Sequence, residues 1–91
     1  MKIIKINAMW CPGCLISKGI WNDIEKEYPN HEYINLDYDL DEEIVEKYNV
    51  GELLPVVIIE KDGKEIKRII GEKTKKVILE SLCELLWEKY L

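Results

Sequence analysis

The sequence is poor in positive charge and in long apolar stretches. Thirteen Lys and Arg residues stand against eighteen Asp and Glu residues, for a formal net charge of −5. This balance argues against nucleic acid or an anionic membrane surface as a partner. The longest apolar run covers residues 53–59 and is interrupted by Pro55, whereas a membrane-spanning helix needs about 20 apolar residues. The first residues lack a signal-peptide cleavage site, so we expect a soluble protein without a membrane segment.

Cysteine is also scarce, with three residues in all. An odd, small number does not form the disulfide framework of a secreted mini-protein, and we expect a reducing, cytoplasmic location. There, a close pair such as Cys11 and Cys14 is catalytic or metal-binding. A closed zinc site needs about four ligands, and Cys83 and His31 have no partner at ligand spacing. A metal site within one chain is therefore disfavoured, while an iron–sulfur cluster shared by two subunits stays an alternative.

The 91 residues are 47% hydrophobic and 34% charged, which indicates one globular domain over residues 1–91. Hydrophobic periodicity predicts strands at 2–6, 32–37, 56–59 and 65–70, and helices at 12–28, from 39 or 41 to 48, and at 74–90. Asp39 or Asp41 would cap the second helix, and Asp62-Gly63 signals a hairpin. The order β-α-β-α-β-β-α predicts an α/β fold with a four-stranded mixed sheet and helices on both faces.

Apolar spacing also predicts which side of each helix is buried. The first helix would bury Leu15, Ile16, Ile20, Ile24 and Tyr28, with Trp21 beside them and without a role in a site. We expect the second helix to bury Ile44, Val45 and Tyr48. The last helix would bury Ile78, Leu79, Leu82, Leu86 and Tyr90, with Cys83 packed next to this face and Trp87 flanking it.

The Cys11-Pro12-Gly13-Cys14 segment lies where the first strand gives way to a helix. Pro12 suits the first helical turn, because its missing N–H costs nothing there. Unpaired N–H groups and the helix dipole stabilise a thiolate at this point. Cys11 can then act as a nucleophile, and Cys14 can close a disulfide with it.

Three features occur together and in order: Trp10-Cys11-x-x-Cys14 after the first strand, Leu54-Pro55 before the third strand, and Lys61-Asp62-Gly63 followed by a strand that ends at Gly71. In this respect the chain resembles the thioredoxin/glutaredoxin superfamily, in its small, glutaredoxin-sized form. The resemblance covers nearly the whole chain and implies the thioredoxin-like fold.

The resemblance also implies roles for individual residues. Cys11 would be the attacking cysteine, nearer the surface, and Cys14 the buried resolving one, with Pro12 and Gly13 between them. Pro55 would be cis, and the backbone of Leu54 would pair with a substrate segment. An apolar rim around Cys11 would consist of Met9, Trp10, Leu53 and Gly71. No bound cofactor is implied beyond a redox-active Cys11–Cys14 disulfide.

Departures from the family pattern bear on the chemistry. The Pro12-Gly13 pair matches neither the Gly-Pro of thioredoxins nor the Pro-Tyr of classical glutaredoxins. The resemblance therefore does not indicate whether the reduction potential is that of a reductant or of an oxidant. Lys5 stands near the position of the buried acid of thioredoxins, and it would favour a thiolate if it pointed toward the cysteines. The segment Gly71-Glu72-Lys73-Thr74 lacks the glutathione-binding residues of glutaredoxins.

These features predict a monomeric thiol–disulfide oxidoreductase that acts on protein disulfides. A flavin-dependent disulfide reductase or another dithiol donor would restore the Cys11–Cys14 dithiol. A glutathione-dependent glutaredoxin is the alternative within the same class. A metal- or cluster-binding CxxC module and a redox-regulated binding module are the alternatives from other classes.

Overall fold

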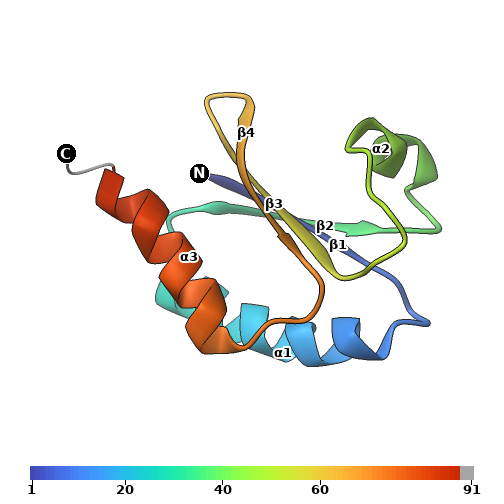
Figure 1. Cartoon of the computed structure of the whole chain (residues 1–91), viewed down its shortest axis with the longest axis horizontal. Helices are drawn as coiled ribbons and strands as arrows, with labels where there is room; N and C mark the ends of the chain where they lie inside the picture. Colours follow the sequence, from blue (N-terminus) through green and yellow to red (C-terminus); the bar gives the residue numbers. More distant parts are fainter. Residues whose placement is uncertain (89–91) are drawn as a thin grey trace.

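A computed structural model describes residues 1–88 of the chain, with side chains as far as Cys83. Four strands and three helices follow in the predicted order β-α-β-α-β-β-α (Figure 1). The strands are β1 (Lys2–Asn7), β2 (Glu32–Asp37), β3 (Val56–Lys61) and β4 (Lys64–Ile70). The helices are α1 (Pro12–Glu27), α2 (Glu42–Lys47) and α3 (Lys75–Glu88). No helix within residues 1–88 is long and apolar enough to cross a membrane.

The strands form one mixed sheet in the order β2-β1-β3-β4. β1 runs parallel to β2, with Ile4 opposite Ile34, and β3 is antiparallel to both β1 and β4. The β3–β4 hairpin turns at Asp62 and Gly63, which have φ angles of 53° and 78°. Positive φ at both central residues is what a tight hairpin turn requires, so the Asp-Gly prediction is confirmed.

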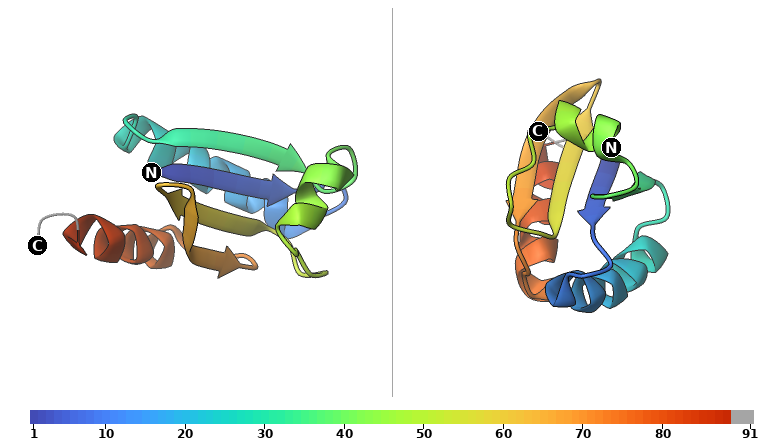
Figure 2. Two further views of the ribbon diagram at one scale, coloured as in Figure 1. Left: turned by 90° about the horizontal axis from the view of Figure 1, so that it is seen from above. Right: turned by 90° about the vertical axis from the view of Figure 1, so that its right-hand side faces the viewer.

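The helices lie on opposite faces of the sheet (Figure 2). α1 and α3 cover one face, and the short α2 covers part of the other, which confirms the predicted three-layer arrangement. Because alternate residues of a strand point to opposite faces, each buried strand contributes to two cores. The core beneath α1 and α3 contains Ile3, Trp21, Ile24, Val57, Ile59, Ile69, Ile78 and Leu82. The core on the α2 side contains Ile4, Ile6, Ala8, Cys11, Cys14, Val45, Leu54, Val56 and Ile58.

The buried side of α1 differs from the predicted one. Leu15 and Ile16 are 68% and 56% exposed, so the prediction that they face the core is wrong. The fully buried positions are Cys14, Ser17, Trp21 and Ile24, which follow the alternating three- and four-residue spacing of one helix face. Ser17 is polar and Trp21 looked peripheral, so the sequence pattern favoured a stripe rotated by one position.

Two further burial predictions are wrong. In α2, Val45 is buried but Ile44 is 45% exposed, because a six-residue helix places only one position firmly against the sheet. In α3, Ile78 and Leu82 are buried whereas Cys83 is exposed, since it lies about 100° around the helix from Leu82. The side chains of Leu86, Trp87 and Tyr90 lie outside the described ones.

The start of α2 also differs in detail from the prediction. Asp41 occupies the N-cap position but makes no side-chain hydrogen bond to the helix. Instead its carboxylate accepts a hydrogen bond of 2.7 Å from the backbone N–H of Asp37. The Asp37 carboxylate in turn accepts the N–H groups of Asp39 and Leu40, each at 2.9 Å. The loop between β2 and α2 is therefore fixed by its own aspartates.

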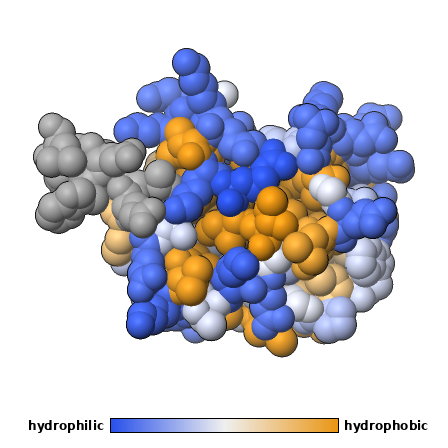
Figure 3. Space-filling model, in the orientation of Figure 1, coloured by the Kyte–Doolittle hydropathy of each residue, from blue (hydrophilic) through white to orange (hydrophobic). Residues whose placement is uncertain are grey.

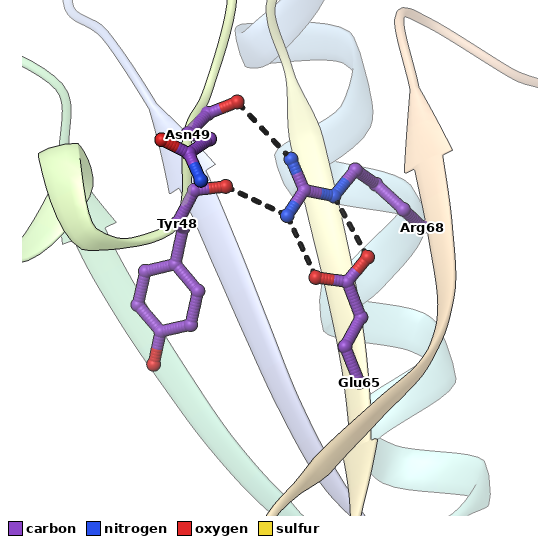
Figure 4. Close-up of polar contacts among 4 residues, drawn as sticks. All are labelled: Tyr48, Asn49, Glu65 and Arg68. Carbon is purple, nitrogen blue, oxygen red and sulfur yellow. Dashed lines mark hydrogen bonds and ion pairs between the residues drawn. The ribbon is translucent and has the colours of Figure 1, made fainter.

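Arg68 of β4 forms hydrogen bonds to the C-terminal end of α2 (Figure 4). Its guanidinium donates to the carbonyl oxygens of Tyr48, at 2.7 Å, and Asn49, at 3.4 Å. It also makes two bonds to the Glu65 carboxylate, of 2.7 and 3.0 Å, and these hold the pKa of Glu65 below its usual value. Carbonyl groups at a helix end lack partners within the helix. Arg68 supplies hydrogen-bond donors for two carbonyls at the end of α2 and so connects this helix to the edge strand β4.

Candidate active site

Cys11 is the N-cap residue of α1. Its backbone is extended, with φ −99° and ψ 109°, and its Sγ accepts a hydrogen bond of 3.2 Å from the N–H of Cys14. Pro12 occupies the first turn, where an N–H would have no helical partner. The sulfur thus takes the place that a Ser or Asp oxygen usually holds at a helix start. This confirms the predicted position of Cys11 at the junction of strand and helix.

Both cysteines of the pair are free thiols and both are buried. Cys11 is 6% exposed and Cys14 4%, so the expected difference in exposure between the two residues is wrong. Burial raises the pKa of Cys14 from 9.0 to about 11, and hydrogen bonding to Cys11 and the charge of Cys11 add to this rise. A hydrogen bond from the Ala8 backbone acts in the opposite direction. Cys14 is therefore held as a neutral thiol beside Cys11.

The Leu54–Pro55 peptide bond is cis, as expected. The Pro55 ring lies beside the cysteine loop, because its Cδ is 3.8 Å from the position that a Cβ on Gly13 would occupy. The Pro55 carbonyl accepts a hydrogen bond of 2.8 Å from the N–H of Gly71. Gly71 has a φ of +84°, a left-handed conformation that favours glycine. The fold thus brings Cys11, Pro55 and Gly71 together from three distant parts of the sequence.

Leu54 and Leu53, which precede the proline, take different surroundings. Leu54 is buried in the same core as both cysteines, so its side chain contributes packing at the site. Leu53 is exposed, and its side chain contacts Gly71 at 3.6 Å from the position of a Cβ there. Of these two neighbouring leucines, only Leu53 therefore presents its apolar side chain at the surface, beside Gly71.

The residues predicted to form an apolar rim include three exposed apolar side chains. Met9, Trp10 and Leu53 are all strongly exposed, and Met9 and Trp10 directly precede Cys11. In Figure 3, hydrophobic side chains gather across the middle of the visible face, where Figure 1 shows the β3–β4 part of the sheet, and hydrophilic ones border them. The Trp10 indole donates a hydrogen bond of 2.8 Å to the Asp39 carboxylate. The rings of Trp10 and Tyr38 pack edge to face, with ring centres 6.1 Å apart. Sequence reasoning missed both partners of Trp10, and Asp39 had drawn attention only as a helix cap.

Lys5 does not point out to solvent. It is buried, and its Nζ forms an ion pair of 2.5 Å with Glu25 of α1. The ammonium also lies 6.0 Å from the Trp21 ring centre and 5.6 Å from that of Tyr33, within cation–π range. No feature of the sequence had identified Glu25, which pairs with Lys5 across the α1–sheet interface.

Lys5 and Cys14 share the wall of one cavity of about 410 Å³ between α1 and the β1–β2 edge of the sheet. Polar groups from the helix and from both strands complete the lining, among them Asn22, Asn35 and Asp37. The Lys5 ammonium is not among the groups that shift the pKa of Cys14. The partner of the Lys5 ammonium in this structure is therefore the Glu25 carboxylate.

The described residues contain no group of three or more His, Cys, Asp and Glu side chains arranged to hold a metal ion. His31 lies near the N-terminus, where its Nδ1 is 3.3 Å from the Met1 amino group. Cys83 is exposed on α3. Within this part of the chain, neither residue joins Cys11 and Cys14 in a common ligand set.

The comparisons with known proteins agree with one another. The thioredoxin family model matches residues 1–84. An H-type thioredoxin from Oryza sativa subsp. indica is 32% identical over 71 residues, covering 78% of this chain and 57% of that protein. A thioredoxin from Chlamydia trachomatis is 30% identical over 82 residues, covering 90% of this chain and 79% of that protein. The crystal structure of thioredoxin from Trypanosoma brucei brucei superposes with a TM-score of 0.84 at 27% identity, covering 93% of this chain and 74% of that one.

The length of the chain distinguishes it from several relatives. It spans between 57 and 65% of the length of three plant H-type thioredoxins that it matches. The matched region contains the whole sheet, all of α1 and α2 and most of α3. From the family match, the sequence relatives and the shared fold, we conclude that the chain belongs to the thioredoxin family.

Proposed function

We propose that this protein is a thiol–disulfide oxidoreductase that reduces protein disulfides through a Cys11/Cys14 dithiol–disulfide cycle. One observation carries the proposal: the Cys11 sulfur caps α1 with Cys14 beside it, in a loop that packs against the cis proline Pro55. A thiolate at a helix start is a nucleophile. A second thiol next to it can release the product without any other group.

In the first step, the Cys11 thiolate attacks one sulfur of the substrate disulfide. A mixed disulfide forms between Cys11 and that sulfur, the substrate S–S bond breaks, and the departing substrate sulfur takes a proton from solvent. In the second step, Cys14 loses its proton to water and attacks the Cys11 sulfur. The bond between Cys11 and the substrate breaks, the second substrate sulfur leaves as a thiolate that takes a proton from solvent, and the Cys11–Cys14 disulfide remains. Two electrons have then passed from the protein to the substrate.

The surroundings of Cys14 support this order of events. Two of the causes that raise the pKa of Cys14 are its hydrogen bond to Cys11 and the charge of Cys11. Once Cys11 is in the mixed disulfide, its charge is gone and it is a poorer acceptor. The pKa of Cys14 then falls toward the value that burial, the largest cause of the rise, sets by itself, so Cys14 gives up its proton more readily at the stage that needs a nucleophile.

The apolar rim of Met9, Trp10 and Leu53 favours a protein substrate, because exposed apolar side chains around a site are suited to contact another protein. In the proposal, an extended substrate segment pairs with the backbone of Leu54 beside Pro55. A flavin-dependent disulfide reductase, or another dithiol donor, returns the protein to the dithiol form. A reducing compartment such as the cytoplasm would hold this cycle.

Reduction of insulin disulfides tests the proposal. The wild-type protein is assayed with three donors: NADPH and thioredoxin reductase, glutathione with its reductase, and dithiothreitol. We expect turnover in the wild type, complete loss in Cys11→Ser, and a stable mixed disulfide with substrate in Cys14→Ser. Cys83→Ser is the matched control, and it should keep full activity because Cys83 lies on α3, on the other face of the sheet.

The choice of donor separates a thioredoxin-type cycle from a glutathione-dependent one, and equilibration with dithiol buffers gives the potential that Pro12-Gly13 leaves open. Wild-type protein that accelerates insulin reduction with none of the three donors would overturn the proposal.

A further inference from the structure

The Glu72 side chain lies over the cysteine loop. A Cβ placed on Gly13 would be 3.3 Å from the Glu72 Oε2 and 3.5 Å from the Glu72 Cβ. The same position is 3.8 Å from Pro55 Cδ. The carboxylate therefore lies beside the dipeptide between the two cysteines and next to the cis proline. Glu72 is exposed, so its charge also faces solvent at the entrance to the site.

Gly13 leaves room for this carboxylate. A contact of 3.3 Å to a Cβ is tighter than usual, so a side chain at position 13 would require the Glu72 carboxylate to shift from its present place beside the loop. The unusual residue at position 13 and the acidic residue at position 72 thus fit each other. This packing offers a physical reason for a glycine at position 13, where the sequence departs from the family pattern.

The charges around the entrance are mostly negative. On the Trp10 side, the Asp39 carboxylate is held by the indole N–H. Glu52 is exposed next to the rim residue Leu53. Lys73 is exposed after Glu72, and Lys18 lines the cavity behind Cys14. Because the Glu72 carboxylate lies beside Gly13, a substrate segment that approaches Cys11 along the cis-proline side comes close to this negative charge.

We propose that Glu72 determines substrate specificity: it favours disulfides flanked by Lys or Arg and disfavours those flanked by Asp or Glu. This inference rests on the proposed function, because it concerns the substrate of the same site. The ammonium or guanidinium of the substrate would pair with the Glu72 carboxylate while the disulfide sulfur meets Cys11. A disulfide that carries carboxylates, such as oxidised glutathione, would meet repulsion at the same place.

The expected effect is moderate, because the pair is exposed to solvent. Exposed ion pairs contribute from about 0.2 to 1 kcal/mol, which corresponds to a change of up to about fivefold in kcat/KM. Salt screens such pairs. The preference should therefore be largest at low ionic strength and shrink as salt is added.

Three synthetic peptide disulfides that differ only in the residue beside the reacting cysteine test the inference. This residue is Lys, Gln or Glu, and kcat/KM is measured for each peptide at low and high salt. Wild-type protein is compared with Glu72→Gln, which keeps the side-chain shape but removes the charge. Glu80→Gln is the matched control, since it makes the same change of charge at an exposed position of α3.

We expect wild-type protein and Glu80→Gln to prefer the Lys peptide over the Glu peptide by about three- to fivefold at low salt. Glu72→Gln should reduce this preference to less than about twofold. Equal preferences in Glu72→Gln and Glu80→Gln would contradict the inference while leaving the proposed function intact. If wild-type protein reduces none of the peptides and no insulin, the proposed function itself fails.

Discussion

The two faces of the sheet serve different purposes. The core beneath α1 and α3 is built from eight buried side chains, all aliphatic except Trp21. The core on the α2 side includes both cysteines of the pair and Leu54 of the cis-proline segment. Its helix has six residues, against sixteen in α1, and on β4 Ile70 stays 47% exposed. One face is a closed apolar core, and the other ends in a reactive site.

This difference separates the face that contributes most to stability from the face that contains the reactive cysteines. Burial of large aliphatic side chains contributes most of the favourable free energy of folding. Seven isoleucines are among the largest completely buried side chains. Four of them, Ile3, Ile24, Ile59 and Ile78, lie on the α1–α3 face, and Ile4, Ile6 and Ile58 lie on the α2 side. Both faces thus draw on isoleucines of the central strands, but only the α1–α3 face adds such residues from helices.

The largest expected effect comes from opening the α1–α3 face at Ile24, which is fully buried. Ile24→Ala should lower the free energy of unfolding by about 3 kcal/mol, because it leaves a cavity in a closed core. Urea denaturation measures this change. Insulin reduction by the folded variant should match the wild type, since Ile24 is in the core that contains neither cysteine of the pair.

Ile16→Ala on the same helix is the matched control, because Ile16 is 56% exposed. We expect it to change the free energy of unfolding by less than about 0.5 kcal/mol. Similar losses in the two variants would mean that the helix does not bury the stripe containing Ile24. The contrast between the two faces would then fail on the α1 side.

A smaller effect should appear on the α2 side as a dependence of stability on pH. Cys14 has a pKa of about 11 in the folded protein against an ordinary value of 9.0. The folded state keeps its proton while the unfolded state loses it, so the stability is present below pH 9 and is lost as the pH rises to 11. This loss should be on the order of 2 kcal/mol for the reduced protein.

Cys14→Ser serves as the reference, because serine does not titrate in this range. The difference in the free energy of unfolding between reduced wild type and Cys14→Ser isolates Cys14 from other groups, including Tyr33 and Lys75, whose pKa values are also raised. A difference that stays constant from pH 8 to 11 would show that Cys14 is not held as a neutral thiol.

The smallest expected effect concerns the fastening of α2. Arg68→Ala removes the donors to the Tyr48 and Asn49 carbonyls, and it should lower the free energy of unfolding by about 1 kcal/mol. Hydrogen exchange should increase in residues 42–50 and stay unchanged in α1. Arg68→Lys retains the charge but cannot donate to two acceptors in the geometry of a guanidinium, so its free energy of unfolding should lie between those of the wild type and of Arg68→Ala. Uniform exchange throughout the chain would contradict a local role for Arg68.

Most of the fold could be predicted from the sequence, because its signals are local. Alternating β-branched residues mark the strands, Asp62-Gly63 marks the hairpin, and Pro12 marks the start of α1. All strand ends lie within two residues of the prediction. The position of Cys11 follows from the same local pattern, since a strand that gives way to a helix leaves unpaired N–H groups at that point.

What the sequence left open depends on contacts between distant residues. The buried stripe of α1 passes through Ser17, a polar residue that no periodicity analysis assigns to a core. Glu72 lies over Gly13 only because β4 ends at Gly71 beside the cis proline. The burial of both Cys11 and Cys14 likewise occurs in a core that they share with Leu54, about 40 residues further along the chain. Such features appear only when the chain is folded.

The Lys5–Glu25 pair constrains how this chain can change over evolutionary time. Loss of Glu25 alone would leave the buried Lys5 ammonium without its carboxylate partner, whereas loss of Lys5 alone would leave the Glu25 carboxylate, which is 28% exposed, in contact with water. Exchange of both for apolar residues of similar size is tolerated better than removal of the partner of a buried charge. A lineage would therefore tolerate a change of Lys5 before a change of Glu25 more readily than the reverse order. The two residues are 20 positions apart in the sequence, so this dependence arises only in the folded chain.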